Sequence, residues 1–189
     1  MGLHPTGGDG EYVGRCQHCV SVREREAPMH MYSVVVDVAW WDPEDAAISG
    51  ALSRAPFPLV PQWVGHSATV GAEVSAESPE DALALLSKTL SDAGLQIVRF
   101  DAGLVSISDI AEELDVSRET VRLWAAGLRR DDFPLRFAHV GQSQVWAWSE
   151  VFEWAIRHGY DIPQSPQPIP LRAIERANGA LADRNLVAV

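Results

Sequence analysis

The pattern of apolar and polar positions is most regular between residues 105 and 124. Ser106 stands where a helix N-cap is expected, and Asp109 follows three residues later, at the spacing of a capping box. Apolar residues then recur at the three- and four-residue spacing of one helix face, in the set Ile107, Ile110, Ala111 and Leu114. The pattern predicts a short helix that begins after Ser106.

A second capped helix is predicted almost directly after the first. Ser117 can cap it, and Val121 and Trp124 fall on one of its faces. Only Asp115 and Val116 separate the two helices, so the chain must turn sharply and the helices must cross. Two helices joined in this way form a helix-turn-helix, which places its second helix in the major groove of DNA.

A hairpin and a third helix are predicted after this pair. Residues 137–140 and 145–148 are expected to be strands joined by a turn at Gly141-Gln142-Ser143, with a helix over 149–154 behind them. Four of the seven tryptophans lie in this region: Trp124, Trp146, Trp148 and Trp154. Their spacing favours the core of a small domain over base stacking, with Trp146 and Trp148 packed together on one strand face.

The first half of the chain predicts an alternation of strands and helices. A strand is expected over 32–40, with Tyr32, Val34, Val36, Val38 and Trp40 on one face. Asp42-Pro43 is expected to open a helix that runs to about Arg54. The remaining expected elements are an edge strand near 58–64, a strand over 68–76, a helix from Ser78 to Gly94 and a strand over 96–100.

These elements predict an α+β fold with two domains. A small ferredoxin-like α+β domain over 31–102 would carry its helices on one face of an antiparallel sheet, and a winged helix-turn-helix domain would follow over 103–160. The opposite face of the sheet would suit either dimerisation, which we favour slightly, or simple solvation. That face is expected to hold Ser33, Val35, Asp37, Thr69, Glu73 and Arg99.

Both ends of the chain look less regular. Residues 1–30 are expected to be a disordered leader, absent altogether if translation starts at Met29 or Met31. A proline-rich linker begins at residue 161, and a weak amphipathic helix from Leu171, broken at Gly179, completes the segment 161–189. This helix would dock on its own chain, dock on a partner, or fray.

Segment 103–160 resembles helix-turn-helix regulators, and specifically the small excisionase-type winged helices related to the MerR family. Ala111 occupies the small-residue position of their first helix, and Val116 occupies the apolar position of the turn. Asp115 stands where many such units have glycine, and aspartate tolerates the left-handed conformation better than most residues. The whole chain also resembles, more loosely, uncharacterised actinobacterial proteins that join a small α+β domain to such a unit.

The charge balance limits how DNA could be bound. The chain of 189 residues has a formal net charge of −11, which argues against a general coat for nucleic acid. Residues 31–103 hold three Lys or Arg and ten Asp or Glu, whereas residues 104–160 hold six Arg and nine Asp or Glu. Binding would therefore require the arginines to gather on one face, and its affinity would be modest and salt-sensitive.

Other classes of site find little support. Cys16-Gln17-His18-Cys19 is a weak candidate for half a zinc site or a redox dithiol, but nearby histidines lack regular spacing, so an incidental pair is expected. No phosphate loop, dinucleotide fingerprint or nucleophile elbow is present, so neither an enzyme nor a cofactor is expected. Without a long apolar run or a secretory signal, we expect a cytoplasmic protein with no membrane span.

The expected function is sequence-specific binding of double-stranded DNA by a homodimeric transcriptional regulator, with an unknown small-molecule or protein effector. Two alternatives stay open: an adaptor that binds protein through the helix-turn-helix, and an excisionase-like architectural DNA-binding factor. Arg118 and Arg122 would reach guanines or phosphates, unless they are ordinary surface arginines on a solvated helix face. The full set of expected DNA contacts is Ser117, Arg118, Glu119, Arg122, Arg129, Arg130, Arg136, Gln142, Ser143 and Gln144.

Overall fold

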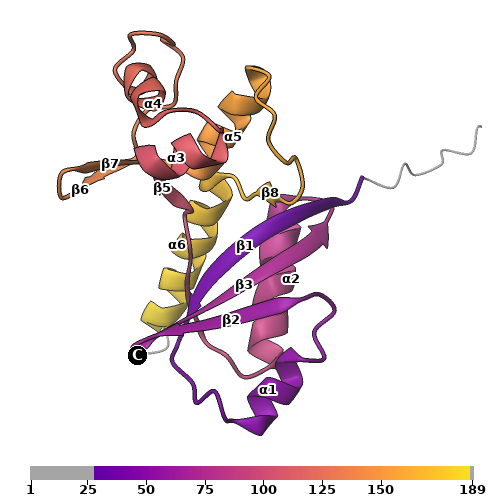
Figure 1. The fold of residues 1–189 in the computed structure, drawn as a ribbon. Helices are drawn as coiled ribbons and strands as arrows, with labels where there is room; N and C mark the ends of the chain where they lie inside the picture. Colours follow the sequence, from indigo (N-terminus) through magenta and orange to yellow (C-terminus); the bar gives the residue numbers. More distant parts are fainter. Residues whose placement is uncertain (1–27, 188–189) are drawn as a thin grey trace, which may run out of the picture.

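The chain folds as a mixed α+β protein with six helices and two sheets in residues 28–187, the part that the computed structural model describes (Figure 1). The leader expected over residues 1–30 lies outside this part except for its last three residues, and Cys16 and Cys19 lie outside it as well. None of the described helices has the length and apolarity needed to cross a membrane.

The larger sheet has the strand order β2-β3-β1-β4, with each neighbouring pair antiparallel. Strands β1 and β3 pair along their whole length, from His30 opposite Ala76 to Val38 opposite Ala68. Alternate side chains along both strands are buried, as their apolar pattern predicts. The strands are β1 (His30–Val38), β2 (Leu59–Val64), β3 (Ser67–Ala76) and β4 (Ile97–Phe100).

One face of this sheet is covered by helices. Ser78 caps α2 (Pro79–Asp92) by accepting a hydrogen bond from Asp81 N at 3.1 Å, and Leu83, Leu86 and Leu90 of this helix are buried. The short helix α1 (Ala46–Leu52) adds partly buried side chains to the same core. The predicted arrangement, with helices on one face of an antiparallel sheet, is therefore present.

The chain between β1 and α1 differs from its prediction. Strand β1 ends at Val38, so its alternation does not reach Trp40, which is 55% exposed. Trp41 is 6% exposed instead, and its ring centroid lies 4.8 Å from that of Trp63. Asp42 accepts a hydrogen bond from Glu44 N and so forms a turn, and Asp45 caps the helix that begins at Ala46 rather than at Pro43.

The second sheet is small and has the order β5-β7-β6. Its hairpin is the predicted one, but the third strand, β5, was not predicted, because Leu104 and Val105 are too short an apolar run to indicate a strand. Val105 of β5 lies opposite Trp146 of β7, which ties the hairpin to the start of α3. The elements of this lobe are β5 (Leu104–Ser106), α3 (Ile107–Glu113), α4 (Arg118–Ala125), β6 (Ala138–Val140), β7 (Ser143–Ala147) and α5 (Trp148–Arg157).

Helices α3 and α4 are capped and joined as the sequence predicts. Ser106 and Asp109 form the capping box of α3, and Ser117 accepts a hydrogen bond from Thr120 N at the start of α4. Asp115 adopts the left-handed conformation with φ of 49°, and Val116 N donates to Ala111 O at 2.9 Å. The tight turn lets Ile110, Ala111, Val121 and Trp124 enter one core.

Aromatic rings fill this second core. The Trp154 ring lies 5.0 Å from Trp124 and 4.9 Å from Phe133, measured between centroids. The expected contact between Trp146 and Trp148 is wrong: Trp146 pairs with Phe133 at 6.0 Å, whereas Trp148 begins α5 and pairs with Phe152 at 6.1 Å. The strand ends one residue earlier than predicted, so the two tryptophans do not share a strand face.

The C-terminal segment returns to the first sheet. Strand β8 (Gln167–Pro168) pairs in parallel with Tyr32 and Ser33, and α6 (Leu171–Val187) runs through Gly179 without a break. Ala173, Ile174 and Leu181 of α6 are buried in the core of the first sheet. Helix α6 therefore docks on its own chain, and the segment before it is held against β1 instead of standing free as a linker.

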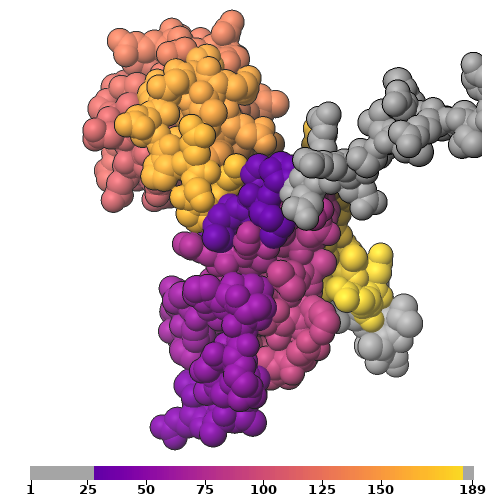
Figure 2. Space-filling model, turned by 90° about the vertical axis from the view of Figure 1, so that its right-hand side faces the viewer, coloured from indigo at the N-terminus to yellow at the C-terminus, as the bar shows by residue number. Residues whose placement is uncertain are grey.

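The two cores define two lobes. The first lobe consists of residues 30–100 and 167–187, and the second lobe consists of residues 104–162. In Figure 2 the second lobe, coloured pink to orange, stands above the first, with yellow α6 beside the magenta residues of the lower lobe. The chain passes between the lobes twice, once in each direction.

Candidate nucleic-acid interface

Helix α4 presents one buried and one exposed face. Val121 and Trp124 point into the core of the second lobe, so Arg118 and Arg122, one turn apart, remain exposed on the opposite side. In the described chain, Arg118 has no hydrogen bond or ion pair with another side chain. Its guanidinium is therefore available to a ligand.

The turn of the β6–β7 hairpin lies beside this helix. Gly141 has a φ of 60°, a conformation that glycine adopts at no steric cost, and the polar residues Gln142 and Ser143 follow it on the exposed tip. Pairing of β5 with β7 holds the hairpin against the start of α3, with Ser106 opposite Val145.

Helix α4, the hairpin turn and the start of α3 surround one hollow of about 490 Å³. Arg118 and Arg122 are the only charged residues in its lining, so the lining of this hollow carries positive charge in a protein that is acidic as a whole. The turn supplies amide and hydroxyl groups beside the two guanidinium groups. The complete lining is Ser106, Ile107, Ser108, Arg118, Arg122, Ala125, Ala126, Gln142, Ser143 and Gln144.

Two of the predicted contact residues serve the helix itself. Ser117 Oγ accepts from Thr120 N at 3.1 Å, so its hydroxyl oxygen already caps α4. Glu119 Oε2 lies 3.5 Å from Arg122 Nη1, with both side chains more than 60% exposed. Such an exposed ion pair is weak and would yield readily to a phosphate or a base.

The three remaining arginines have different surroundings. Arg129 and Arg136 are exposed, and Arg136 lines a neighbouring hollow of about 470 Å³ together with Leu135 and Gln144. Arg130 is half-buried, and its Nη1 lies 2.7 Å from His158 Nδ1, while its Cζ lies 5.9 Å from the centre of the Trp154 ring. Arg130 lines the same hollow as Arg136, but its guanidinium already contacts His158 and Trp154, so it is less available to a phosphate than Arg129 or Arg136.

A polar chain continues from Arg130 through the imidazole. His158 Nε2 lies 2.7 Å from Asp132 Oδ2, and Trp154 Nε1 donates to Asp132 Oδ1 at 3.3 Å. The hydrogen bond from His158, aided by that from Trp154, holds the pKa of Asp132 below its usual value. The arrangement anchors the segment after α4 to α5. Within residues 28–187 no three His, Cys, Asp or Glu side chains are placed to hold a metal ion.

Sequence reasoning missed the contribution of the start of α3 to this site. Ser106 and Ser108 line the hollow, although the sequence marks Ser106 only as a helix cap. Their position depends on the pairing of β5 with β7, which joins residues about 40 positions apart. The only local signal of that strand is the pair of apolar residues Leu104 and Val105 before the cap Ser106.

In comparisons with known proteins, no protein-family model, no curated protein and no solved structure matches the chain.

Proposed function

We propose that the second lobe is a winged helix-turn-helix that binds double-stranded DNA in a sequence-specific manner. The order of its elements, the tight turn at Asp115 and the three-stranded sheet with its protruding hairpin support this assignment. Helix α4 would lie in the major groove, and the β6–β7 hairpin would act as the wing.

The observation that carries the proposal is the hollow between α4 and the hairpin turn. Arg118 and Arg122 are its only charged residues, and Gln142, Ser143 and Gln144 add hydrogen-bonding groups from a separate element. Arginine can bind guanine O6 and N7 with two hydrogen bonds, and the polar tip can reach a phosphate or an adjacent groove. We assign base recognition to the two arginines and phosphate contacts to Arg129 and Arg136.

We further propose that the first lobe is a ferredoxin-like domain through which two copies pair. Its strand order and antiparallel pairing suit that fold, and the sheet face without helices exposes Val35 beside the ion pair between Asp37 and Arg99. One small DNA-binding unit contacts few base pairs, so a dimer would supply the specificity that a transcriptional regulator needs. A regulator of this kind would act in the cytoplasm.

Selection from a pool of random duplexes, followed by sequencing, tests DNA binding. We expect the wild-type protein to enrich a defined motif at low salt and the double variant Arg118→Ala/Arg122→Ala to enrich none. Arg157→Ala is the matched control, because Arg157 is an exposed arginine of the same lobe that lines a different hollow. Failure of the wild-type protein to enrich any motif refutes the proposal.

A protein-binding adaptor is the second candidate, and exposed apolar side chains of the second lobe favour it. Leu135 is 87% exposed and Leu128 is 72% exposed, and Phe137 and Val140 of the hairpin region are also exposed. A stable protein partner that is lost with Leu135→Ser but kept with Arg118→Ala/Arg122→Ala would favour this function. An architectural factor would instead bend many unrelated duplexes, which a gel-based bending assay detects.

A further inference from the structure

A second hollow lies between the two lobes, at the point where β1 changes its neighbour. Strand β8 pairs with Tyr32 and Ser33, whereas pairing with β4 begins at Val36. The hollow opens at the intervening edge of β1 and has a volume of about 400 Å³. This volume lies within the range of sites that hold small organic molecules.

Both lobes supply walls of this hollow. The first lobe supplies Phe100, Ile169 and Ile174, and the second lobe supplies Trp148 and Glu113. The chain crosses between the lobes at Asp101–Gly103, and Trp148 N donates to Gly103 O at 2.9 Å. The apolar wall and the half-buried indole of Trp148 suit a ligand with a hydrocarbon or aromatic body.

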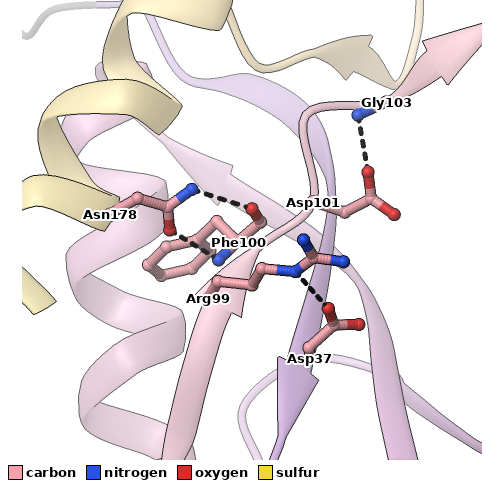
Figure 3. A network of polar contacts seen from close by, with 6 residues as sticks. All are labelled: Asp37, Arg99, Phe100, Asp101, Gly103 and Asn178. Atoms are coloured by element: carbon pink, nitrogen blue, oxygen red, sulfur yellow. Dashed lines mark hydrogen bonds and ion pairs between the residues drawn. The ribbon is translucent and has the colours of Figure 1, made fainter. Parts of the chain in front are cut away.

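The charged residues that line the hollow determine which charge a ligand should carry. Asp101 and Glu113 are the only charged residues that line the hollow, and no Lys, Arg or His joins them. Arg99 lies nearby and makes its hydrogen bond to Asp37, with Nε 2.6 Å from Oδ2 (Figure 3). The hydrogen bond to Asp37 is the main cause that raises the pKa of Arg99, and the charge of Asp101 adds a smaller contribution, but Arg99 does not line the hollow. An anionic ligand would meet repulsion here, whereas a cation would meet two carboxylates and an indole ring.

Each of the two carboxylates can still accept hydrogen bonds from a ligand. Asp101 Oδ1 accepts from Gly103 N at 2.8 Å, which fixes the side chain, but Oδ2 accepts no hydrogen bond from residues 28–187 (Figure 3). Glu113, the last residue of α3, likewise has no side-chain hydrogen bond or ion pair within that range. The site therefore offers two carboxylates, one from the connection between lobes and one from the second lobe.

We propose that this hollow binds an organic cation with an apolar body, of the arylalkylamine class. The ammonium group lies between Asp101 and Glu113, and the hydrocarbon part lies against Trp148 and Phe100. Binding does not depend on the proposed DNA-binding function. A ligand that joins the two lobes would change how the second lobe meets DNA, and this consequence alone rests on that function.

Titration calorimetry of the full chain without DNA tests the site. The ligands are phenethylamine, its neutral counterpart 2-phenylethanol and the anionic 3-phenylpropionate. We expect phenethylamine to bind at least about tenfold more tightly than the alcohol, and the anion not to bind. The Trp148 indole N–H resonance, identified with Trp148→Phe, should shift on addition of the amine.

Matched variants separate this site from unspecific attraction to an acidic protein. Asp101→Asn/Glu113→Gln should abolish the preference for amine over alcohol, whereas Glu112→Gln, a neighbouring exposed position that does not line the hollow, should preserve it. Equal affinity for amine and alcohol, or an unchanged preference in the double variant, overturns the proposal. So does the absence of binding by phenethylamine, tryptamine and benzyltrimethylammonium alike.

Discussion

The side chain of Asn178 makes hydrogen bonds with both backbone groups of Phe100, at the end of the edge strand β4 (Figure 3). Phe100 N donates to Asn178 Oδ1 at 2.8 Å, and Asn178 Nδ2 donates to Phe100 O at 3.0 Å. The amide of α6 thus takes the place of a further strand at this position. It satisfies polar backbone groups that would otherwise be half-buried without partners.

Removal of this amide should destabilise the first lobe. Asn178→Ala leaves Phe100 N and O unpaired beside α6, and we expect it to lower the free energy of unfolding by about 1–3 kcal/mol. Urea denaturation followed by circular dichroism measures the change. Glu175→Ala, at an exposed position of the same helix, should shift the free energy by less than about 0.5 kcal/mol. Equal effects of the two substitutions would show that α6 contributes through helix propensity alone.

The left-handed residue between α3 and α4 gives a second prediction. Asp115 has a φ of 49°, where glycine is unstrained and a β-branched residue is strongly disfavoured. Asp115→Gly should raise the free energy of unfolding by up to about 1 kcal/mol, and Asp115→Val should lower it by about 1–2 kcal/mol. Thermal unfolding of the two variants at the same position provides an internal comparison. A glycine variant less stable than the valine variant would contradict the backbone argument.

Local signals made much of the fold predictable. Ser78, Ser106 and Ser117 each begin a helix in the sequence and in the structure, because a cap acts on backbone groups within three residues of it. The alternation in β1 and β3 likewise reports directly which side chains are buried. Strand β8, in contrast, exists only because Gln167 and Pro168 meet Tyr32 and Ser33. The residues next to Gln167 and Pro168 in the sequence give no indication of that pairing.

The candidate DNA-binding site was predictable to the same extent. Arg118 and Arg122 follow from helix periodicity, since Val121 and Trp124 occupy the buried face of α4. Arg130 could not be assigned in this way, because the residues that hold it, His158 and Trp154, lie on α5. The position of the Arg130 side chain depends on tertiary packing, which cannot be predicted from charge and spacing along the sequence.

The pair formed by Asp132 and His158 predicts a pH dependence of stability. Hydrogen bonds from His158 and Trp154 hold the pKa of Asp132 below its usual value of 3.8. A carboxylate whose pKa is lowered by folding stabilises the folded state above its unfolded pKa, and that contribution is lost as the pH falls through the folded pKa. The stability that this carboxylate adds to the wild-type protein, relative to Asp132→Asn, should therefore be fully present at about pH 5.

The difference in stability between the wild-type protein and Asp132→Asn should narrow as the pH falls below 3.8. At that pH Asp132 becomes protonated in the unfolded chain, and at lower pH it becomes protonated in the folded protein as well. Urea unfolding midpoints across this acidic range measure the effect. Asp131→Asn, at the neighbouring exposed position, is the control for removal of a negative charge from this segment. A gap between wild type and Asp132→Asn that stays constant at all pH values would show that the hydrogen bonds do not act through this titration.

The salt dependence of DNA binding should distinguish the roles of the arginines. Each arginine that neutralises a phosphate contributes about 0.9 to the slope of log affinity against log salt concentration. Arg136→Ala should therefore lower this slope by about one and weaken binding to all sequences alike. Arg118→Ala and Arg122→Ala should instead weaken binding to the preferred sequence by about 1–3 kcal/mol each, with a smaller loss on random duplexes.

Arg130 provides the sharpest comparison within this series. Its guanidinium contacts His158 and the Trp154 ring, so Arg130→Ala should lower the stability of the second lobe and leave the salt slope of the folded protein unchanged. Fluorescence anisotropy of labelled duplexes at several salt concentrations gives the slopes, and unfolding curves give the stabilities. A protein that held DNA only by its overall charge would respond alike to the loss of any arginine. A defined interface is therefore ruled out if the salt slope is equal in Arg118→Ala, Arg130→Ala, Arg136→Ala and the control Arg157→Ala.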